Sequence, residues 1–205
     1  MESTEQNRPA AWLIVAAAGV RTAFGVVMAV DAWLKWQPSF AAHYVGYLQN
    51  AANSQPDWLA PWFGFWLRIV PPHADFFISA TRIIETAIAV GLILGLTRRF
   101  TYLLGAVFSL LIWATAGGFG GPYTAGATNL GPALVYALVF IALILFARLL
   151  GSTPYSLDYF IGRRFPPWAA IMEWAPRRLS PRTSPTLPWP PPPAPMPPAG
   201  PPLPA

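Results

Sequence analysis

Four ionisable residues interrupt two long apolar segments of this sequence. Arg21 and Asp31 lie in the first segment, and Arg82 and Glu85 lie in the second. Both segments are long enough to cross the roughly 30 Å hydrocarbon core of a bilayer. A charged side chain at the centre of that core costs at least about 2.5 kcal/mol. Such residues persist when they are paired, when they face the interior of a helix bundle, or when they take part in function.

Helix geometry places two of these charges at similar depths. At 1.5 Å per residue, Arg21 lies about 15 Å from the inner end of its helix and Glu85 about 18 Å from the inner end of its own. We therefore expect these two side chains to pair if their helices are neighbours. Arg82 can pair with Glu85 three residues along, or reach outward toward Asp31. The four formal charges sum to zero, as a buried polar network requires.

The sequence leaves three roles open for this network. It can hold the helices in register, conduct protons with Glu85 as the titrating group, or bind an anionic or quinone-like ligand through arginine donors in an apolar pocket. Two neighbouring arginines would keep Glu85 ionised, which argues against easy proton exchange. We predict as catalytic or bracing residues Glu85, Arg82 and Arg21. We predict as ligand-binding residues Asp31, Lys35, Trp33, Trp62, Trp66 and His73.

The elements that must position these residues are transmembrane helices. The chain is 55% hydrophobic and 10% charged, whereas a soluble domain is about 25% charged. We predict an all-α polytopic membrane protein, a four-helix bundle whose domain spans residues 11–160. Its four spanning segments are predicted at about 11–34, 76–96, 100–117 and 129–150. Asn129 can cap the last helix, with Pro132 in its first turn.

The connection between the first two spanning helices carries aromatic residues at helical spacing. Phe40, Tyr44 and Tyr47 form one series, and Trp58, Trp62 and Trp66 form a second. This spacing predicts two short amphipathic helices lying at the membrane interface. They can form an aromatic belt at headgroup level, or a cap that covers a quinone or lipid pocket.

The distribution of arginine predicts the orientation in the membrane. Most basic residues lie on one side of a four-helix topology, and that side should be cytoplasmic. They are Arg8, Arg98, Arg99, Arg148, Arg163, Arg164, Arg177 and Arg178. We therefore expect a prokaryotic cytoplasmic membrane protein with both termini cytoplasmic, residues 1–10 forming the N-terminal part. The net charge of +5 then reflects topology, and we predict no nucleic-acid partner.

Two other features limit the possible chemistry. The chain has no cysteine, which excludes thiolate catalysis and cysteine-ligated clusters. His43 and His73 have no further ligands at metal-binding spacing, so no metal site is predicted. The glycine-rich loop at 117–126 lacks the features of a phosphate-binding loop.

The C-terminal residues, 161–205, are rich in proline. From Pro176 onward nearly half of the residues are proline. This composition predicts an extended cytoplasmic tail without a packed core. The tail is either simply solvated or a docking segment for a proline-binding partner.

Several of these motifs resemble the DoxX/DoxD family of small four-helix membrane proteins. They are Arg21 with Gly25, Lys35 and Pro38, then Glu85, the segment 91–99, and the segment 151–158, which contains Ser156-Leu157-Asp158. The resemblance covers about residues 11–160. It departs from fusions of DoxD with a DoxA domain, because this chain ends in a proline-rich segment, and its aromatic connection is long.

The resemblance implies an integral-membrane subunit of a quinone-linked oxidoreductase complex. DoxD is the membrane subunit of thiosulfate:quinone oxidoreductase and works with a partner subunit. A quinone, the lipid bilayer and a protein partner are the implied ligand and partners. The alternative is a structural or assembly protein of the membrane, whose buried charges serve helix packing and whose tail recruits a partner.

Overall fold

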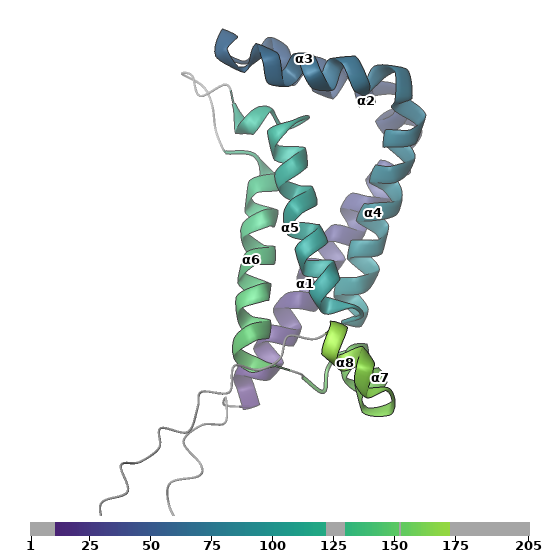
Figure 1. Cartoon of the computed structure of the whole chain (residues 1–205), viewed down its shortest axis with the longest axis vertical. Coiled ribbons are helices and arrows are strands. Elements are labelled where there is room, and N and C mark those ends of the chain that lie inside the picture. The colour runs from purple at the N-terminus through teal and green to yellow at the C-terminus, as the bar shows by residue number, and fades with distance from the viewer. Residues whose placement is uncertain (1–10, 122–129, 152, 173–205) are drawn as a thin grey trace, which may run out of the picture.

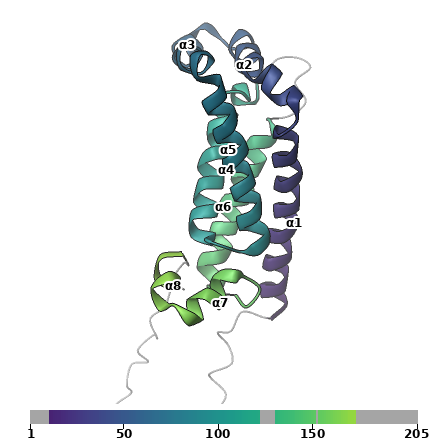
Figure 2. The same cartoon turned by 90° about the vertical axis from the view of Figure 1, so that its right-hand side faces the viewer.

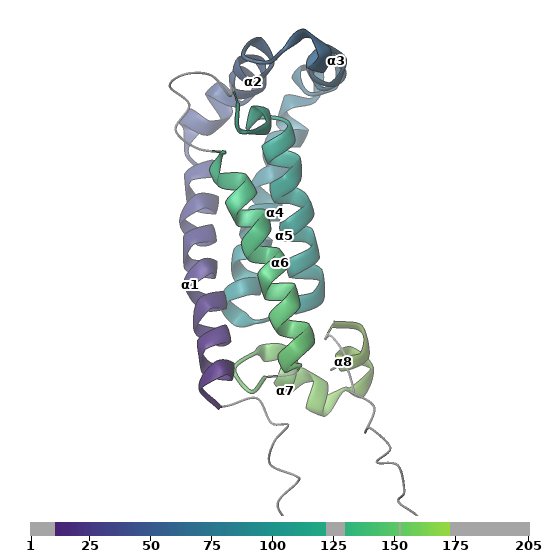
Figure 3. The same cartoon turned by 90° about the vertical axis from the view of Figure 1, so that its left-hand side faces the viewer.

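Four long helices lie alongside one another in the computed structural model, which describes residues 11–121, 130–151 and 153–172 (Figures 1 and 3). The helices are α1 (Ala11–Lys35), α4 (Ala74–Leu94), α5 (Arg98–Ala114) and α6 (Pro132–Leu150). They agree with the four predicted apolar segments to within a few residues. All other regular elements of the described residues are also helical, so the predicted all-α class is confirmed.

Three segments are long and apolar enough to cross a membrane: Trp12–Lys35, Asp57–Leu94 and Pro132–Leu150. The second segment includes the connection that precedes α4. Helix α5 has 17 residues, which corresponds to about 25 Å and is slightly short for a full span. The chain therefore has the character of a membrane protein in its described residues.

The aromatic connection forms two helices, as the spacing predicts. They are α2 (Pro38–Asn53) and α3 (Ala60–Ile69), with short 3-10 turns η1 (Asp57–Leu59) and η2 (Pro71–His73) after each. We call Pro38–His73 the cap. It lies across one end of the long helices (Figures 1 and 2), which we call the cap end.

Small residues set the closest helix contacts. A Cβ atom added to Gly25 of α1 would lie 2.9 Å from Ile93 of α4. A Cβ on Gly105 of α5 would overlap the ring of Phe140 of α6. Gly19 of α1 differs from these two glycines, because a Cβ added there would have no described atom within 4 Å. The core between the two helix pairs includes Phe24, whose ring centroid lies 5.0 Å from that of Phe140.

The opposite end carries α7 (Leu157–Arg164) and α8 (Pro166–Met172), and we call it the α7 end. Residues 161–172 were predicted to belong to the extended tail, and this boundary is wrong. Ser156 caps α7 by accepting a hydrogen bond from the Tyr159 amide, and Trp168 of α8 is anchored to Asp158 of α7. These interactions extend the helical part of the chain to Met172. Residues 173–205 lie outside the described residues.

The turns before α6 and before α3 connect distant parts of the chain or differ from the prediction. Helix α6 begins at Pro132 after Gly131, whose φ is 89°, and Asn129 lies outside the described residues. Pro56 precedes η1 and α3, and the Gln55 side chain donates to the Gly118 carbonyl oxygen at 2.7 Å. That bond ties the tip of the cap to η3 (Gly118–Gly120), the turn after α5.

Candidate functional site

The buried charges separate into two clusters at opposite ends of the long helices. The cluster at the cap end centres on Lys35, the last residue of α1. Its Nζ lies 3.6 Å from Oε2 of Glu85 and 3.8 Å from Oδ1 of Asp31. Glu85 is 3% exposed, so its carboxylate depends on this lysine for charge compensation. Tyr136 of α6 also interacts with Asp31. This cluster joins α1, α4 and α6.

Arg82 belongs to the same end but has a different partner from those predicted. Its Nε donates to the Lys35 carbonyl oxygen at 2.8 Å, and its guanidinium lies 5.4 Å from the Trp36 ring centroid. Within the described part of the chain it forms no ion pair with Glu85 or Asp31. The last carbonyls of a helix have no intrahelical partner, so Arg82 satisfies one of them and fixes the end of α1.

Arg21 lies at the α7 end, and its predicted pairing with Glu85 is wrong. Its Nη2 donates to the Tyr155 carbonyl oxygen at 2.7 Å, and its guanidinium packs against Gly95, the residue that ends α4. The prediction assumed that α1 and α4 end at the same level. Instead about 15 Å of α1, from Ala11 to Arg21, extends beyond the end of α4. The predicted neutral network therefore does not form.

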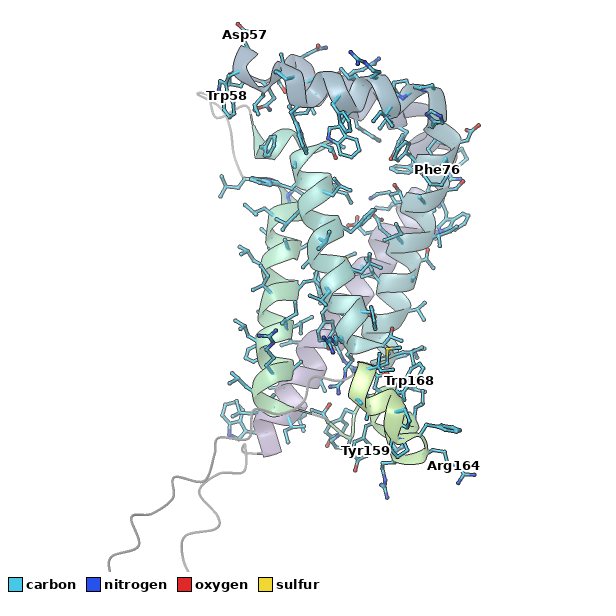
Figure 4. All side chains as sticks on the ribbon, in the orientation of Figure 1. Asp57, Trp58, Phe76, Tyr159, Arg164 and Trp168 are labelled. Atoms are coloured by element: carbon cyan, nitrogen blue, oxygen red, sulfur yellow. The ribbon has the colours of Figure 1, made fainter. Side chains whose placement is uncertain are left out.

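Asp158 is the centre of the second cluster. It is fully buried and accepts hydrogen bonds from the amides of Thr97 and Arg98 at 2.8 and 2.7 Å. The Trp168 indole donates to it at 3.0 Å, and the Arg98 Nε lies 3.8 Å away. The Thr97 and Arg98 amides are at the start of α5, where backbone donors lack helical partners. Asp158 therefore caps α5 from a distant part of the chain. Figure 4 shows Trp168 beside the end of the long helices.

A large cavity lies between the cap and the long helices. Its volume is about 700 Å³, within the range of pockets that hold small organic ligands. Most of its lining is apolar and aromatic, contributed by the cap, α4 and α5. The aromatic lining residues are Phe40, Tyr44, Tyr47, Trp66, Phe76, Phe77 and Phe108. Phe76 is labelled in Figure 4, where it lies near the bend between the cap and α4.

Three polar side chains form one edge of this cavity: Lys35, Tyr44 and Thr81. The Tyr44 hydroxyl lies 3.4 Å from the Thr81 hydroxyl. Burial raises the pKa of Tyr44 above its ordinary value, so this phenol stays protonated and can donate a hydrogen bond. The Lys35 ammonium forms ion pairs with Glu85 and Asp31. The edge can thus present an ammonium and hydroxyl groups to an oxygen acceptor inside a largely apolar space.

The predicted aromatic ligand residues divide between the cavity and its surroundings. Trp66 lines the cavity. Trp62 packs against Trp66 with ring centroids 5.8 Å apart and donates to the Ala114 carbonyl oxygen at 2.8 Å, holding the cap on α5. Trp33 is 62% exposed and does not line the cavity. His73 contacts the Ile69 carbonyl oxygen at 3.0 Å and also lies outside the lining.

Sequence reasoning did not select Tyr44 and Thr81 as site residues. A signal was present, because Thr81 lies one helical turn before Glu85 and therefore shares its face. Tyr44 belongs to the aromatic series of α2, yet the sequence does not show which face of α2 turns toward α4. The contact between its hydroxyl and that of Thr81 depends on how the cap folds over the long helices.

Potential metal ligands are scattered over residues 11–121, 130–151 and 153–172. No three His, Asp or Glu side chains of those residues come together in an arrangement that would hold a metal ion. The polar edge of the cavity consists of an amine and hydroxyl groups, which suit an organic oxygen acceptor.

Comparisons of the chain with protein families, with curated proteins and with solved structures find no match. Function is therefore inferred from the geometry of the two clusters and of the cavity.

Proposed function

We propose that this protein is an integral-membrane subunit that binds a lipid-soluble quinone in the cavity beneath the cap. The observation that carries the proposal is the cavity of about 700 Å³ with Lys35, Tyr44 and Thr81 on one edge. A quinone combines a flat apolar ring with two carbonyl oxygens. Its ring suits the aromatic walls, and its oxygens suit amine and hydroxyl donors.

The cluster around Lys35 supplies the polar part of this binding. Lys35 and Tyr44 would donate hydrogen bonds to one quinone oxygen, with Thr81 orienting the Tyr44 hydroxyl. Glu85 does not line the cavity. It and Asp31 instead position the Lys35 ammonium. Glu85 is therefore proposed as a positioning residue, and Arg82 supports it by fixing the end of α1.

The same proposal includes the membrane arrangement and the complex. We infer that α1, α4, α5 and α6 all cross the membrane as a four-helix bundle of the DoxX/DoxD type, with both termini cytoplasmic. Electrons for quinone reduction would come from a protein partner, as the resemblance implies. Thiosulfate:quinone oxidoreductase is the example suggested by the resemblance.

The test is quinone binding by the full chain. Wild-type protein in maltoside micelles should bind a short-chain ubiquinone or menaquinone analogue, measured by quenching of tryptophan fluorescence. Lys35→Gln and Tyr44→Phe should each weaken binding about tenfold, since each removes one hydrogen bond to the ligand. Ala80→Phe should abolish binding, because Ala80 lines the cavity and a phenyl ring would fill it.

Arg68→Gln is the matched control, since Arg68 is an exposed cation of the cap outside the cavity lining. It should bind the analogue as wild type does. Folded Ala80→Phe protein with unchanged affinity would refute the cavity as the binding site.

The alternative, a structural or assembly protein, also has a specific observation in its favour. The Asp158 cluster and the bonds from Trp62 and Gln55 tie distant segments together without lining the large cavity. If assembly is the function, quinone analogues should not bind the wild-type chain, and Lys35→Gln should reduce the yield of a native complex instead.

A further inference from the structure

A second, much smaller cavity lies at the α7 end, far from the cap. Its volume is about 30 Å³, room for one or two non-hydrogen atoms. Its walls come from α1 and α6, and they include Ala17, Leu143 and Phe146. Its polar lining includes Arg21, Arg98 and Tyr102. It is therefore a basic recess between two apolar helix faces.

Arg21 is not satisfied by the groups that surround it. The side chain is 5% exposed, and only Nη2 has a hydrogen-bond acceptor, the Tyr155 carbonyl oxygen. Its Nε and Nη1 are buried and have no hydrogen-bond partner among the residues that the structure describes. A buried charged donor without an acceptor is costly, and natural structures supply one from protein, water or a ligand.

The charges that the structure places here are also unbalanced. Arg98 is ion-paired with Asp158, so that pair is neutral overall. Arg21 has a carbonyl oxygen, not a carboxylate, as its recorded acceptor. The three groups together carry a net charge of +1. One singly charged anionic group would both balance this charge and accept the remaining hydrogen bonds of Arg21.

The level of the recess identifies the class of anion. Arg21 lies against Gly95, which follows α4, and beside Arg98, the first residue of α5. It is therefore at the level where α4 finishes and α5 begins. If α4 and α5 cross the membrane as proposed above, the end that they share lies near the headgroup region of one leaflet, because their 21 and 17 residues correspond to about 31 and 25 Å of helix. Basic recesses between transmembrane helices at that level suit lipid phosphate groups, and the apolar faces of α1 and α6 suit the acyl chains.

We propose that the recess between α1 and α6 binds the phosphate group of an anionic phospholipid through Arg21. Two phosphate oxygens enter the recess and accept from the Arg21 guanidinium, a geometry that arginine favours. Arg98 lines the recess, and Asp158, its ion-pair partner, fixes the start of α5 beside it. This site is separate from the cavity beneath the cap.

The experiment measures thermal unfolding of the full chain in maltoside micelles doped with phosphatidylglycerol or with phosphatidylcholine. Phosphatidylglycerol should raise the Tm of the wild type more than phosphatidylcholine does, because only the former has a net negative headgroup. From the dose dependence, Arg21→Gln should weaken phosphatidylglycerol binding roughly tenfold or more, as loss of charged hydrogen bonds predicts. Arg21→Lys should retain part of the effect, because it keeps the charge but not the paired donors.

Arg163→Gln is the matched control. Arg163 is an exposed arginine of α7, so it lies at the same end but outside the recess. It should leave phosphatidylglycerol binding unchanged within about twofold, the size of a surface charge effect. Ala17→Phe provides a second test that keeps Arg21 intact. A ring at this position would fill the recess and should remove the lipid effect, even if Arg21→Gln fails to fold.

Inorganic phosphate and chloride, compared at equal ionic strength, distinguish the source of the anion. Stabilisation by phosphatidylglycerol that is lost in Ala17→Phe supports the lipid site. Stabilisation by free phosphate without any preference for phosphatidylglycerol would overturn the lipid assignment and leave a site for the free ion. Equal stabilisation by both lipids, or full retention of the lipid effect in folded Arg21→Gln, would overturn the proposal and indicate a cavity filled by water.

Discussion

Lys35 connects the buried charge cluster with the large cavity. It lines the cavity and lies within ion-pair distance of both Asp31 and Glu85. Its side chain is 22% exposed, whereas that of Glu85 is 4% exposed. The lysine therefore faces the cavity, whereas the glutamate is buried and contacts the lysine without lining the cavity. This arrangement assigns contact with a ligand to Lys35 and its orientation to Glu85.

The energetic dependence within this pair is testable by a double-mutant cycle. Lys35→Met should lower the free energy of unfolding by about 3 kcal/mol, because it leaves the Glu85 charge buried without its cation. The double variant Lys35→Met/Glu85→Leu should recover a large part of that loss, since both charges are gone. Urea or thermal unfolding of the solubilised protein, followed by circular dichroism, measures both. Additive losses in the double variant would show that the two residues are not coupled.

Asp158 should be the most sensitive acidic residue at the α7 end. Asp158→Ala removes the acceptor of two amides at the start of α5 and of the Trp168 indole. It also leaves Arg98, which is 5% exposed, without this carboxylate. We expect a loss of about 3–5 kcal/mol in unfolding free energy, the usual effect of breaking a buried charge pair. Urea or thermal unfolding of the solubilised protein, followed by circular dichroism, measures this loss.

The exposed Asp75 of α4 is the control for Asp158. Asp75→Ala should change the free energy of unfolding by less than about 1 kcal/mol, as a helix N-terminal charge at the surface does. Equal effects of the two substitutions would remove the special role given to Asp158.

At the scale of the helices, two glycines fix the pairing of α1 with α4 and of α5 with α6. Gly25→Leu and Gly105→Leu should each lower the free energy of unfolding by about 1–3 kcal/mol, because each side chain would overlap Ile93 or Phe140. Gly19→Leu is the internal control, since no described atom lies within 4 Å of its added Cβ. Thermal unfolding ranks the three variants. The pairing is refuted if Gly19→Leu is as destabilising as the other two.

The helices were predictable from sequence, but their relative heights were not. Apolar runs predict α1, α4, α5 and α6 within a few residues, and aromatic spacing predicts that α2 and α3 exist, because hydrophobic periodicity is a local signal. The level of Arg21 depends instead on the stagger between α1 and α4, which the contact of Gly25 with Ile93 sets. A single helix carries no information about that stagger, so the predicted pairing of Arg21 with Glu85 failed.

The residues of the candidate site were also only partly predictable from the sequence. Asp31, Lys35 and Glu85 were selected because charges in apolar helices are uncommon, and the structure brings these three together. Trp66 was selected from its aromatic series and lines the cavity. For Asp158 the sequence offers only its place in the Ser156-Leu157-Asp158 motif. Its role as a cap of α5 requires a contact between segments about 60 residues apart, which no local pattern reveals.

The whole molecule has two chemically different ends. The cap end combines aromatic rings with the Lys35 cluster, and the α7 end carries most of the arginines of the described residues. These are Arg21, Arg98, Arg99, Arg148, Arg163 and Arg164. Positive charge of this kind favours the cytoplasmic side of a membrane. The proposed orientation therefore places the cap, with the cavity beneath it, on the opposite side.

Single cysteines can test this orientation, because the chain has no cysteine of its own. Asn53→Cys places an exposed thiol in the cap, and Arg164→Cys places one at the end of α7. A membrane-impermeant maleimide applied to intact cells or spheroplasts should label Asn53→Cys directly. It should label Arg164→Cys only after the membrane is opened with detergent. Denatured samples of both variants, labelled in full, provide the reference for thiol reactivity. Labelling of both thiols in intact cells would contradict the bundle that crosses the membrane, and labelling of Arg164→Cys alone would reverse the orientation.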